Sequence, residues 1–598
     1  MVFFLYNKKV LKVFGKIIRI EKNNIYIKNE THKTDTTLMG CHVIFEEETR
    51  LVVGEITFID EEIIKILLVG EIINHSFSSG VVRKPSGNGQ IRIINKDELE
   101  LIIGSNEIKK GYLLLGKSAI YDNFNVSVPL NDFFANHNAI IGNTGAGKSC
   151  GVARIIQNLF TGPKIPLHAH LVLFDAYGEY INAFNKIDKQ NQIHIKKYTS
   201  KIEQQDEYLL KFPAYFLEAD DLAILLAIKD AGSISILEKA LKLVRIFKSE
   251  NRIAKEYKND IIAKCLLDIL SSGNRPAQIR DQFMAILNSY YTDEINLDTI
   301  ISQPGYYRTI RQCLRIDESG KISAITEVME FLKEYTRLKI EDIPFIENIA
   351  YSLEDLYYAL EFALISEGAM NSSETHDKNI FLKARLMNII NGNYKDIFNV
   401  DTYYMKDTFV RNMFEKEEGK VQLININLSD VDDAFAKILT KLYAKLFFQF
   451  TTSLKPRGSY SINILLEEAH RYVQNDTDTQ IIGYNIFDRI TKEGRKYGTL
   501  LTFITQRPSE LSTTALSQCS NFLVFRIFHP KDLEIIRSIS ANVTEETIEK
   551  LKTVNPGSAF IFGVGIKLPI LVKLELPDPT PESTSLDITN LWYEGEEK

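Results

Sequence analysis

Apolar and polar residues are arranged in three different ways along the chain, and each arrangement predicts a different structure. From residue 1 to about 105, short β-rich runs such as VFGKIIRIEKNNIYIKN and LVVGEITFIDEEIIKILLVGEI are separated by polar turn residues. Short strands with polar turns and few helical patterns are typical of a small barrel or sandwich. The first arrangement therefore predicts an N-terminal β domain.

The second arrangement combines buried strands with helices. The run NAIIGN predicts a strand, residues 147–160 a helix, and LHAHLVLFDAYGEY a second strand. This βαβ order implies a parallel sheet. Strand-like runs return from residue 420 onward, and the apolar segment DAFAKILTKLYAKLFFQFTTSL predicts a helix between the first two of them.

In the third arrangement, apolar residues lie three and four positions apart, as in SLEDLYYALEFALISEGA, which predicts helices. Because α/β patterns lie on both sides of this region, we interpret it as an insertion into one α/β domain. We expect the following segments: an N-terminal β-barrel at 1–105, a linker at 106–130, the first half of the α/β core at 131–200, a helical insertion at 201–415, the second half of the core at 416–576 and a C-terminal tail at 577–598.

Composition narrows the class of protein. The chain has 598 residues, of which 45% are hydrophobic and 25% charged, as in ordinary globular proteins. A net charge of -7 argues against a surface that is basic throughout, although a basic groove remains compatible with it. No run approaches the ~18 apolar residues of a membrane span, and no signal peptide is evident. We therefore expect a cytoplasmic protein without a membrane segment.

Cysteine and histidine usage gives little indication of a metal site. The five cysteines show no CxxC spacing, which suits reduced thiols in the cytosol. His168 and His170 are the one tight histidine pair, and their spacing suits one face of a strand better than a zinc site.

The segment GNTGAGKS matches the phosphate-binding pattern G-x-x-x-x-G-K-[ST]. Its glycines let backbone N–H groups point at phosphates, and the following helix adds its positive end. Lys148 reaches the β- and γ-phosphates, and the Ser149 hydroxyl holds Mg²⁺. The predicted nucleotide-binding residues are Gly142, Asn143, Thr144, Gly145, Ala146, Gly147, Lys148, Ser149 and Cys150.

A phosphate loop needs acidic partners, and the segment INILLEEAH supplies them at a predicted strand end. Glu467 suits the Mg²⁺ shell, and Glu468 suits the polarisation of an attacking water. Two glutamates after a strand are more often solvated, but the phosphate loop favours the functional interpretation here.

The strand TLLTFITQRP carries two further candidates. Gln506 at its end can sense the γ-phosphate and orient water, unless it is a simple polar strand end. Arg495 lies just before the strand and can act as an arginine finger on a neighbouring subunit's nucleotide. Arg489 is the competing cation, and a solvated helix end is the alternative for both.

Taken in order, the segments IIGNTGAGKS, LVLFDAYGEY, LLEEAHRYV, KEGRKYGTLLTFITQRPSEL and LSQCSNFLVFRI resemble the HerA-type ATPases. These are hexameric DNA translocases of the RecA-like class, related to FtsK. The resemblance covers both core halves, and it implies a RecA-like P-loop core with an N-terminal barrel and a helical insertion. It also implies a homo-hexamer with Mg²⁺ and ATP at subunit interfaces and double-stranded DNA in a central channel.

The resemblance also assigns roles to residues. It implies that Glu468 is catalytic together with Lys148, Gln506 and the trans-acting Arg495. Glu467 takes the metal position beside Ser149. Asp175, which matches the first position of a D-x-x-G-E-Y segment, is expected near the nucleotide.

Partners follow from the family rather than from the residues. Family members work with a NurA-type nuclease in DNA end processing, and bacterial relatives with nuclease or sirtuin-like effectors in phage defence. The chain shows no nuclease carboxylate cluster, so an effector would be a separate protein, with the N-terminal barrel as a candidate docking face. Cations that could contact DNA, each more typical of a solvated surface residue, are Arg275, Arg280, Lys455 and Arg457.

Three functions therefore remain open. The first is an ATP-driven DNA translocase or helicase, and the second is a nucleotide-controlled scaffold that activates a partner effector without translocation. The third is a secretion-type motor of the same superfamily, which the expected lack of a membrane segment disfavours.

Overall fold

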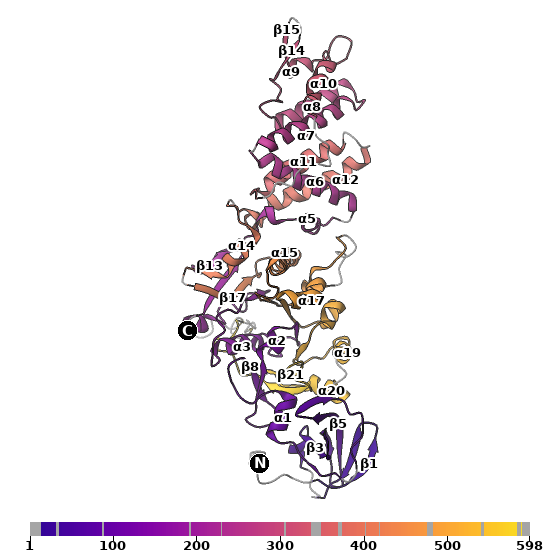
Figure 1. The fold of residues 1–598 in the computed structure, drawn as a ribbon, viewed down its shortest axis with the longest axis vertical. Coiled ribbons are helices and arrows are strands. Elements are labelled where there is room, and N and C mark those ends of the chain that lie inside the picture. Colours follow the sequence, from indigo (N-terminus) through magenta and orange to yellow (C-terminus); the bar gives the residue numbers. More distant parts are fainter. Residues whose placement is uncertain are drawn as a thin grey trace. The chain divides into compact units, whose positions relative to one another are not determined.

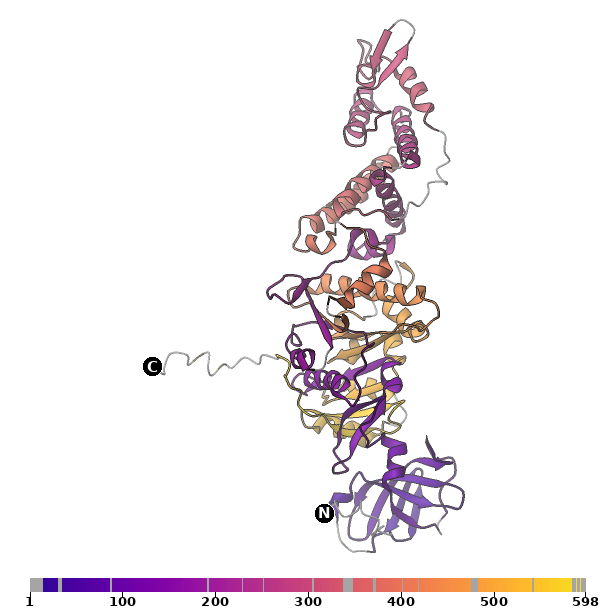
Figure 2. The same cartoon turned by 60° about the vertical axis from the view of Figure 1, so that its left-hand side comes forward.

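The structure is a computed structural model, and the chain forms two compact units (Figures 1 and 2). The described residues are 14–30, 35–86, 89–190, 193–228, 230–250, 252–303, 306–336, 348–368, 373–400, 402–417, 419–474, 482–539, 543–582, 588 and 592. The first unit contains residues 1–208, 410–476 and 484–598, and the second contains residues 209–409 and 477–483.

The first unit begins with an antiparallel β domain, as the sequence predicts. Its strands follow the order β1-β2-β5-β4-β3-β7, and β6 pairs with β5. The backbone N–H of Phe14, just before β1, donates to the Ile91 carbonyl on β7 (2.9 Å), so the two edges of the sheet meet. The strands are β1 (Ile17–Glu21), β2 (Asn24–Lys28), β3 (His42–Glu46), β4 (Leu51–Ile59), β5 (Ile63–Ile73), β6 (Ser76–Ser79) and β7 (Ile91–Ile93).

A large mixed sheet forms the α/β core of the first unit. Its order is β13-β12-β17-β11-β18-β19-β10-β20-β21-β22-β8-β9, with β16 beside β17. The neighbouring strands from β12 to β20 pair in parallel, and those from β20 to β9 pair antiparallel. The strands are β8 (Tyr112–Ser118), β9 (Asn125–Pro129), β10 (Asn138–Ile141), β11 (Leu171–Asp175), β12 (His194–Thr199), β13 (Glu207–Leu209), β16 (Glu415–Lys416), β17 (Gly419–Asn427), β18 (Ile462–Leu466), β19 (Thr499–Thr505), β20 (Asn521–Val524), β21 (Ser558–Gly563) and β22 (Ile570–Lys573).

Strand register places the candidate site at one edge of this sheet. Phe174 on β11 pairs with Leu466 on β18, and Leu466 pairs with Phe503 on β19. Ile141 on β10 pairs with Thr505 on β19. Because parallel strands end at the same edge, their polar end residues come together there, although they are far apart in sequence.

Helices pack against the core strands. Helix α3 contacts β8 and α4, while α15 and α17 contact each other, β19 and, for α15, also β18. The α-helices of the first unit are α1 (Lys96–Ile103), α2 (Leu130–Phe134), α3 (Lys148–Thr161), α4 (Asn185–Gln190), α15 (Asp433–Ser453), α17 (Ile486–Tyr497), α18 (Thr513–Ser517), α19 (Pro530–Ile539) and α20 (Glu545–Thr553).

Two segments differ from the sequence-based expectation. The expected linker at 106–130 instead contains the β8–β9 hairpin, which extends the core sheet beyond β22, because its apolar side chains alternate and their inward members are buried. The first residues of the tail, expected to leave the core, lie on it instead. Gln157 of α3 bonds to the backbone of Asp578 and Pro579, and the N–H of Glu582 donates to the Glu179 carbonyl (2.8 Å).

The second unit is mostly helical, as the sequence predicts, and α11 packs along α6. Figure 2 shows the same helices side by side. The hairpin β14–β15 was not expected from the helical pattern. The elements are α5 (Ala219–Leu225), α6 (Ala231–Lys248), α7 (Arg252–Leu270), α8 (Pro276–Ser289), β14 (Ile300–Gln303), β15 (Tyr306–Thr309), α9 (Ile310–Cys313), α10 (Ile325–Lys333), α11 (Leu353–Gly368), α12 (Ser373–Ile390) and α13 (Lys395–Phe398), and α14 (Lys406–Met413) leads back to the first unit.

Within the described residues, no helix combines the length and the apolarity that crossing a membrane requires.

Candidate nucleotide-binding site

The loop between β10 and α3 has the backbone that a phosphate cradle needs. Gly145 and Gly147 adopt φ values of +72° and +91°. A Cβ on Gly147 would lie 2.6 Å from the Gly557 nitrogen, whereas a Cβ on Gly145 would meet nothing within 4 Å. Gly147 is therefore required by packing as well as by conformation, and Gly145 faces open space where a ligand fits.

Neighbouring strands hold this loop in place. The N–H of Gly142 donates to the Thr505 carbonyl (3.1 Å), and the N–H of Asn143 donates to the Arg526 carbonyl (3.0 Å). The buried Ala146 accepts from the Gly557 N–H at 3.0 Å. These contacts order the loop before any ligand binds.

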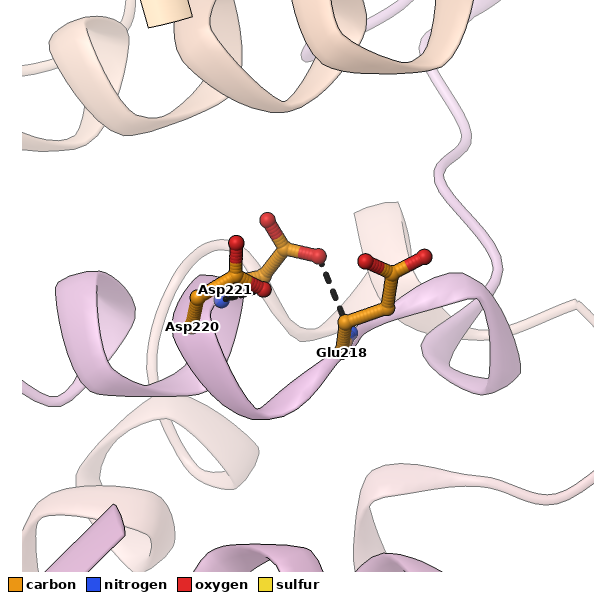
Figure 3. A group of neighbouring side chains, drawn as sticks. All are labelled: Glu218, Asp220 and Asp221. Atoms are coloured by element: carbon orange, nitrogen blue, oxygen red, sulfur yellow. Dashed lines mark hydrogen bonds between the residues drawn. The ribbon is translucent and has the colours of Figure 1, made fainter. Parts of the chain in front are cut away.

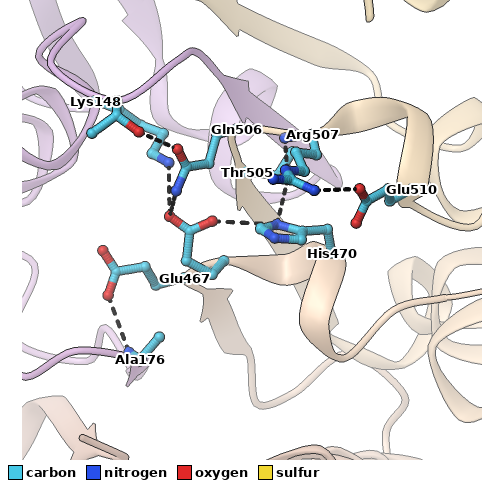
Figure 4. Close-up of polar contacts among 10 residues, drawn as sticks. Lys148, Ala176, Glu467, His470, Thr505, Gln506, Arg507 and Glu510 are labelled. Carbon is cyan, nitrogen blue, oxygen red and sulfur yellow. Dashed lines mark hydrogen bonds and ion pairs between the residues drawn. The ribbon is translucent and has the colours of Figure 1, made fainter. Parts of the chain in front are cut away.

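Two side chains contact Glu468, and a third reaches it through one of them. Lys148 Nζ lies 3.2 Å from Glu468 Oε1, and the two side chains are only 7% and 4% exposed. Gln506 Nε2 donates to the same oxygen at 2.8 Å, and the Thr144 hydroxyl donates to Gln506 Oε1. Figure 4 shows Lys148 and Gln506 converging on this point. Four of the predicted residues are thus brought together.

Glu468 itself has an unusual backbone and a free oxygen. Its φ is 47°, which is uncommon outside glycine and is stored mainly at functional sites. Its Oε2 is buried and accepts no well-formed hydrogen bond from any described residue. His470 Nδ1 lies 3.2 Å from that oxygen.

Glu467 faces a different group of residues. Its Oε2 accepts from the Ala176 N–H at 3.1 Å (Figure 4), and its carboxyl group lies beside that of Asp175. Asp175 is fully buried and accepts from the N–H groups of Tyr180 (2.8 Å) and Glu179 (3.0 Å). Burial, and then the charge of Asp175, raise the pKa of Glu467 well above its usual value. Burial also raises the pKa of Asp175, so both carboxyl groups of this pair hold a proton more tightly than isolated carboxyl groups do.

Several oxygen atoms near Glu467 are buried without partners. Among the described residues, neither the Tyr180 hydroxyl nor Glu179 Oε2 has a hydrogen-bond partner, and the Ser149 hydroxyl lies close to that of Tyr180 without a well-formed bond. Buried oxygen atoms without partners are costly unless a ligand satisfies them. Ser149 and Glu467 supply the hard oxygen donors that Mg²⁺ prefers, so the residues present fit this ion.

The remaining predicted residues lie at different distances from this edge. Cys150 is half-buried in the first turn of α3, where burial and then the charge of Glu179 raise the pKa of its thiol. Arg495 is exposed near the end of α17, beside the amino end of β19. Arg489 is also exposed on α17, with its guanidinium over the rings of Phe448 and Tyr484. Neither arginine joins the cluster around Glu468.

Sequence reasoning missed His470 and Thr505. His470 belongs to a short 3-10 helix (Ala469–Arg471) directly after the two glutamates, and its Nδ1 also lies 3.1 Å from Thr505 Oγ1. The available signal was the closeness of this histidine to two acidic residues in the sequence. The sequence does not indicate, however, in which direction the ring of a residue after a strand end points.

Other polar candidates have ordinary structural explanations. His170 stacks on Tyr460, with ring centroids 3.9 Å apart, and its Nδ1 contacts the Ser461 carbonyl at 3.1 Å. In the second unit, Arg280 pairs with Asp281 at 2.8 Å.

Three carboxylates gather at the start of α5 (Figure 3). Asp221 accepts from the Glu218 N–H at 2.9 Å, and Asp220 accepts from the Asp221 N–H at 3.0 Å. Lys406 pairs with Glu218 at 2.8 Å. These are the contacts of a capped helix start, where negative charge is favourable.

Several known proteins are similar to this chain. The family model described as helicase HerA, central domain, matches residues 111–320. The DNA double-strand break repair helicase HerA of Pyrococcus furiosus is 24% identical over 520 residues, which cover 86% of this chain and 78% of that protein. HerA of Sulfolobus acidocaldarius is 22% identical over 516 residues, with 86% and 78% covered. Among solved structures, VirB4 of Thermoanaerobacter pseudethanolicus aligns with a TM-score of 0.44 and 15% identity, over 78% of this chain and 97% of that one.

Each of these two sequence relatives aligns with 86% of the chain. These comparisons confirm the resemblance to the HerA-type ATPases that the sequence motifs carry.

Proposed function

We propose that this protein is an ATP-driven double-stranded DNA translocase that acts as a hexameric ring. The observation that carries the proposal is the buried ion pair between Lys148 of the phosphate loop and Glu468 of β18's end, 3.2 Å apart. It brings a phosphate-binding cation and a candidate base to one point, beside a loop with room for phosphates.

The ion pair supports a simple sequence of events. The phosphates of ATP attract Lys148 away from Glu468, because they carry more negative charge than one carboxylate. The freed Glu468 Oε1 then accepts a proton from the attacking water, while Gln506 holds the γ-phosphate or the water. Bound Mg²⁺, held by Ser149 and Glu467, would neutralise charge that builds up on the phosphates.

The position of Arg495 supports action on a neighbouring subunit. It precedes β19, whereas Gln506 follows it, and β19 has seven residues. A strand of that length spans about 20 Å. Arg495 is therefore too far from its own phosphate loop, and an arginine finger at this position needs a second subunit.

DNA translocation and partner use are inferred from the relatives. The curated HerA proteins are described as DNA double-strand break repair helicases. We infer the same class of substrate for this chain, and we propose that a separate nuclease or sirtuin-like effector uses the movement, in DNA processing or in phage defence.

The test is ATP hydrolysis by the purified protein with and without linear double-stranded DNA, with mass photometry on the same samples. Wild type should form rings and hydrolyse ATP several-fold faster with DNA. Glu468→Gln should form rings and bind ATP but lose about 100-fold or more in rate. Slow turnover that ignores DNA, with rings intact, would instead favour the assembly scaffold.

A pair of matched variants tests the arginine. Arg495→Ala should lower hydrolysis by about 1,000-fold without changing ATP binding, because a finger acts only on the transition state. Arg489→Ala, on the same helix, is the control and should stay near wild type. A mixture of Arg495→Ala and Glu468→Gln subunits should recover part of the activity if the finger acts in trans.

A further inference from the structure

The ring of His470 lies against Glu468, the proposed catalytic carboxylate. Its Nδ1 is 3.2 Å from Glu468 Oε2 and 3.1 Å from Thr505 Oγ1. Figure 4 shows the ring between Thr505 and the cluster that contains Lys148 and Gln506. The side chain is 16% exposed, so it sits inside the site and not on the surface.

The two oxygens of Glu468 have different partners. Oε1 is shared by Lys148 and Gln506, both of which are expected to move to the phosphates when ATP binds. Oε2 is buried, and His470 is the neighbour that no nucleotide would draw away. Once Oε1 is released, the contact at Oε2 decides how the carboxylate points.

Thr505 fixes the ring in turn. It is fully buried at the end of β19, and its hydroxyl accepts from the Arg507 N–H at 3.0 Å. Thr505 therefore fixes one side of the His470 ring to the core sheet. The ring therefore links the end of β19, which is followed by Gln506, to Glu468.

The charged groups facing the ring are Glu468, Glu510, Lys148 and Arg507, and burial lowers the pKa of His470. Burial thus favours the neutral imidazole, which carries one N–H. With that single hydrogen on Nδ1, the ring faces two acceptors, Thr505 Oγ1 at 3.1 Å and Glu468 Oε2 at 3.2 Å, and it does not compete for the proton that Glu468 takes from water.

We propose that His470 is a positioning residue, which holds Oε2 of Glu468 through Nδ1 so that Oε1 faces the attacking water when ATP has drawn Lys148 and Gln506 away. The inference rests on the proposed role of Glu468. A displaced base of this kind costs on the order of 10- to 100-fold in rate.

The side-chain geometry offers matched variants. The Asn amide nitrogen is two bonds from Cβ, as is Nδ1 of histidine, so His470→Asn keeps the donor in place. The Gln amide nitrogen is three bonds from Cβ, as is Nε2, so His470→Gln moves the donor. His470→Ala removes it.

The experiment measures kcat and KM for ATP, nucleotide binding and thermal unfolding for the three variants, with DNA present. We expect His470→Ala and His470→Gln to lose 10-fold or more in kcat, with KM and binding within about 2-fold of wild type. His470→Asn should remain within about 3-fold of wild type. Unchanged hydrolysis in His470→Ala, or an equal loss in His470→Asn, would overturn the proposal.

A test in the Glu468→Gln variant distinguishes a positioning role of His470 from a purely structural one. If His470 acts through Glu468, adding His470→Ala to Glu468→Gln should cause no further loss of the residual single-turnover rate. A further loss would show that the ring acts elsewhere. Should Glu468→Gln alone keep wild-type activity, the proposed role of Glu468 fails, and that result is visible without any His470 variant.

Discussion

Glu467 and Glu468 are adjacent in the chain, but the groups around their carboxylates have opposite charge. Glu467 lies beside Asp175 and accepts one backbone hydrogen bond, from Ala176. Glu468 is contacted by a lysine ammonium and by the Gln506 amide. The first carboxyl group is therefore held in an acidic region and the second in a basic one.

Strand order explains how two neighbours reach such different surroundings. β18 lies between β11, which ends at Asp175, and β19, which is followed by Gln506. The left-handed conformation of Glu468 turns the chain sharply after Glu467. The acidic region is suited to binding a cation, and the basic region is suited to a proton acceptor near phosphates. The two adjacent glutamates are therefore suited to different chemical roles.

The largest expected effect comes from breaking the ion pair of the basic region. Lys148→Ala leaves Glu468 buried without its cation, which should destabilise the site by about 3 kcal/mol in the absence of nucleotide. Hydrogen exchange of peptides from α3 and β18 during urea titration measures this locally, which suits a protein of two units. In the double variant Lys148→Met, Glu468→Gln, no charge is left unpaired, and most of the stability should return. Equal protection in wild type and Lys148→Ala would show that the pair contributes little.

The two glutamates should also differ in their effect on Mg²⁺. Glu467→Gln should raise the Mg²⁺ concentration needed for ATP binding by about 10- to 100-fold, because it removes a charged oxygen donor. Glu468→Gln is the matched control and should leave that concentration unchanged. Titration of Mg²⁺ with a fluorescent ATP analogue measures both. An equal shift in the two variants would contradict the division of tasks.

A smaller effect is expected on stability without metal. Glu467→Gln removes the cost of ionising a carboxyl group beside Asp175, so the metal-free variant should be more stable than wild type by about 1 kcal/mol at neutral pH.

The pH dependence of that difference has a fixed sign. Because the pKa of Glu467 is raised in the folded state, the folded protein holds its proton where the unfolded chain has lost it. Wild type therefore loses stability relative to the variant as pH rises above the ordinary glutamate value of about 4.3. Urea titrations at pH 4, 5.5 and 7 should show a growing gap, and a constant gap would contradict the raised pKa.

Much of this site could be predicted from local sequence. Each parallel strand that carries a functional residue is a buried apolar run ending in a polar one, as in β18 before Glu467 and β19 before Gln506. The phosphate loop needs glycines at specific positions, so its pattern can be recognised in the sequence without knowledge of the fold. These features are local in the chain, and local patterns can be seen without knowing the fold.

What could not be predicted depends on contacts between distant segments. The Asp175–Glu467 pair joins residues on strands far apart in sequence, and no periodicity shows that β11 and β18 are neighbours. His470 is close to the glutamates in the chain, but its contact with Thr505 depends on the register of β19. The β8–β9 hairpin was missed because its apolar runs are short and interrupted by Gly116 and Lys117.

Substitution of Tyr180 should have the smallest effect on the free energy of unfolding. It tests whether the buried polar groups of the acidic region have hydrogen-bond partners when no metal is bound. Burial, and then the charges of Glu467 and Asp175, raise the pKa of its hydroxyl well above the usual value. Among the described residues that hydroxyl has no hydrogen-bond partner. Tyr180→Phe therefore removes a buried polar group that gains nothing, and the change in unfolding free energy should stay within about 1 kcal/mol, in the stabilising direction.

The control for Tyr180→Phe is Tyr180→Leu, which also removes the ring that stacks on Phe184 at 6.2 Å and should cost about 2 kcal/mol. Chemical denaturation of the metal-free protein distinguishes the two variants. A loss of 1 kcal/mol or more in Tyr180→Phe would mean that the hydroxyl is bonded in solution, with the nearby Ser149 hydroxyl as its partner. The buried hydroxyl in the acidic region would then already have a hydrogen-bond partner before Mg²⁺ binds. In that respect the acidic region would resemble the basic region, where Lys148 already pairs with Glu468 in the absence of a ligand.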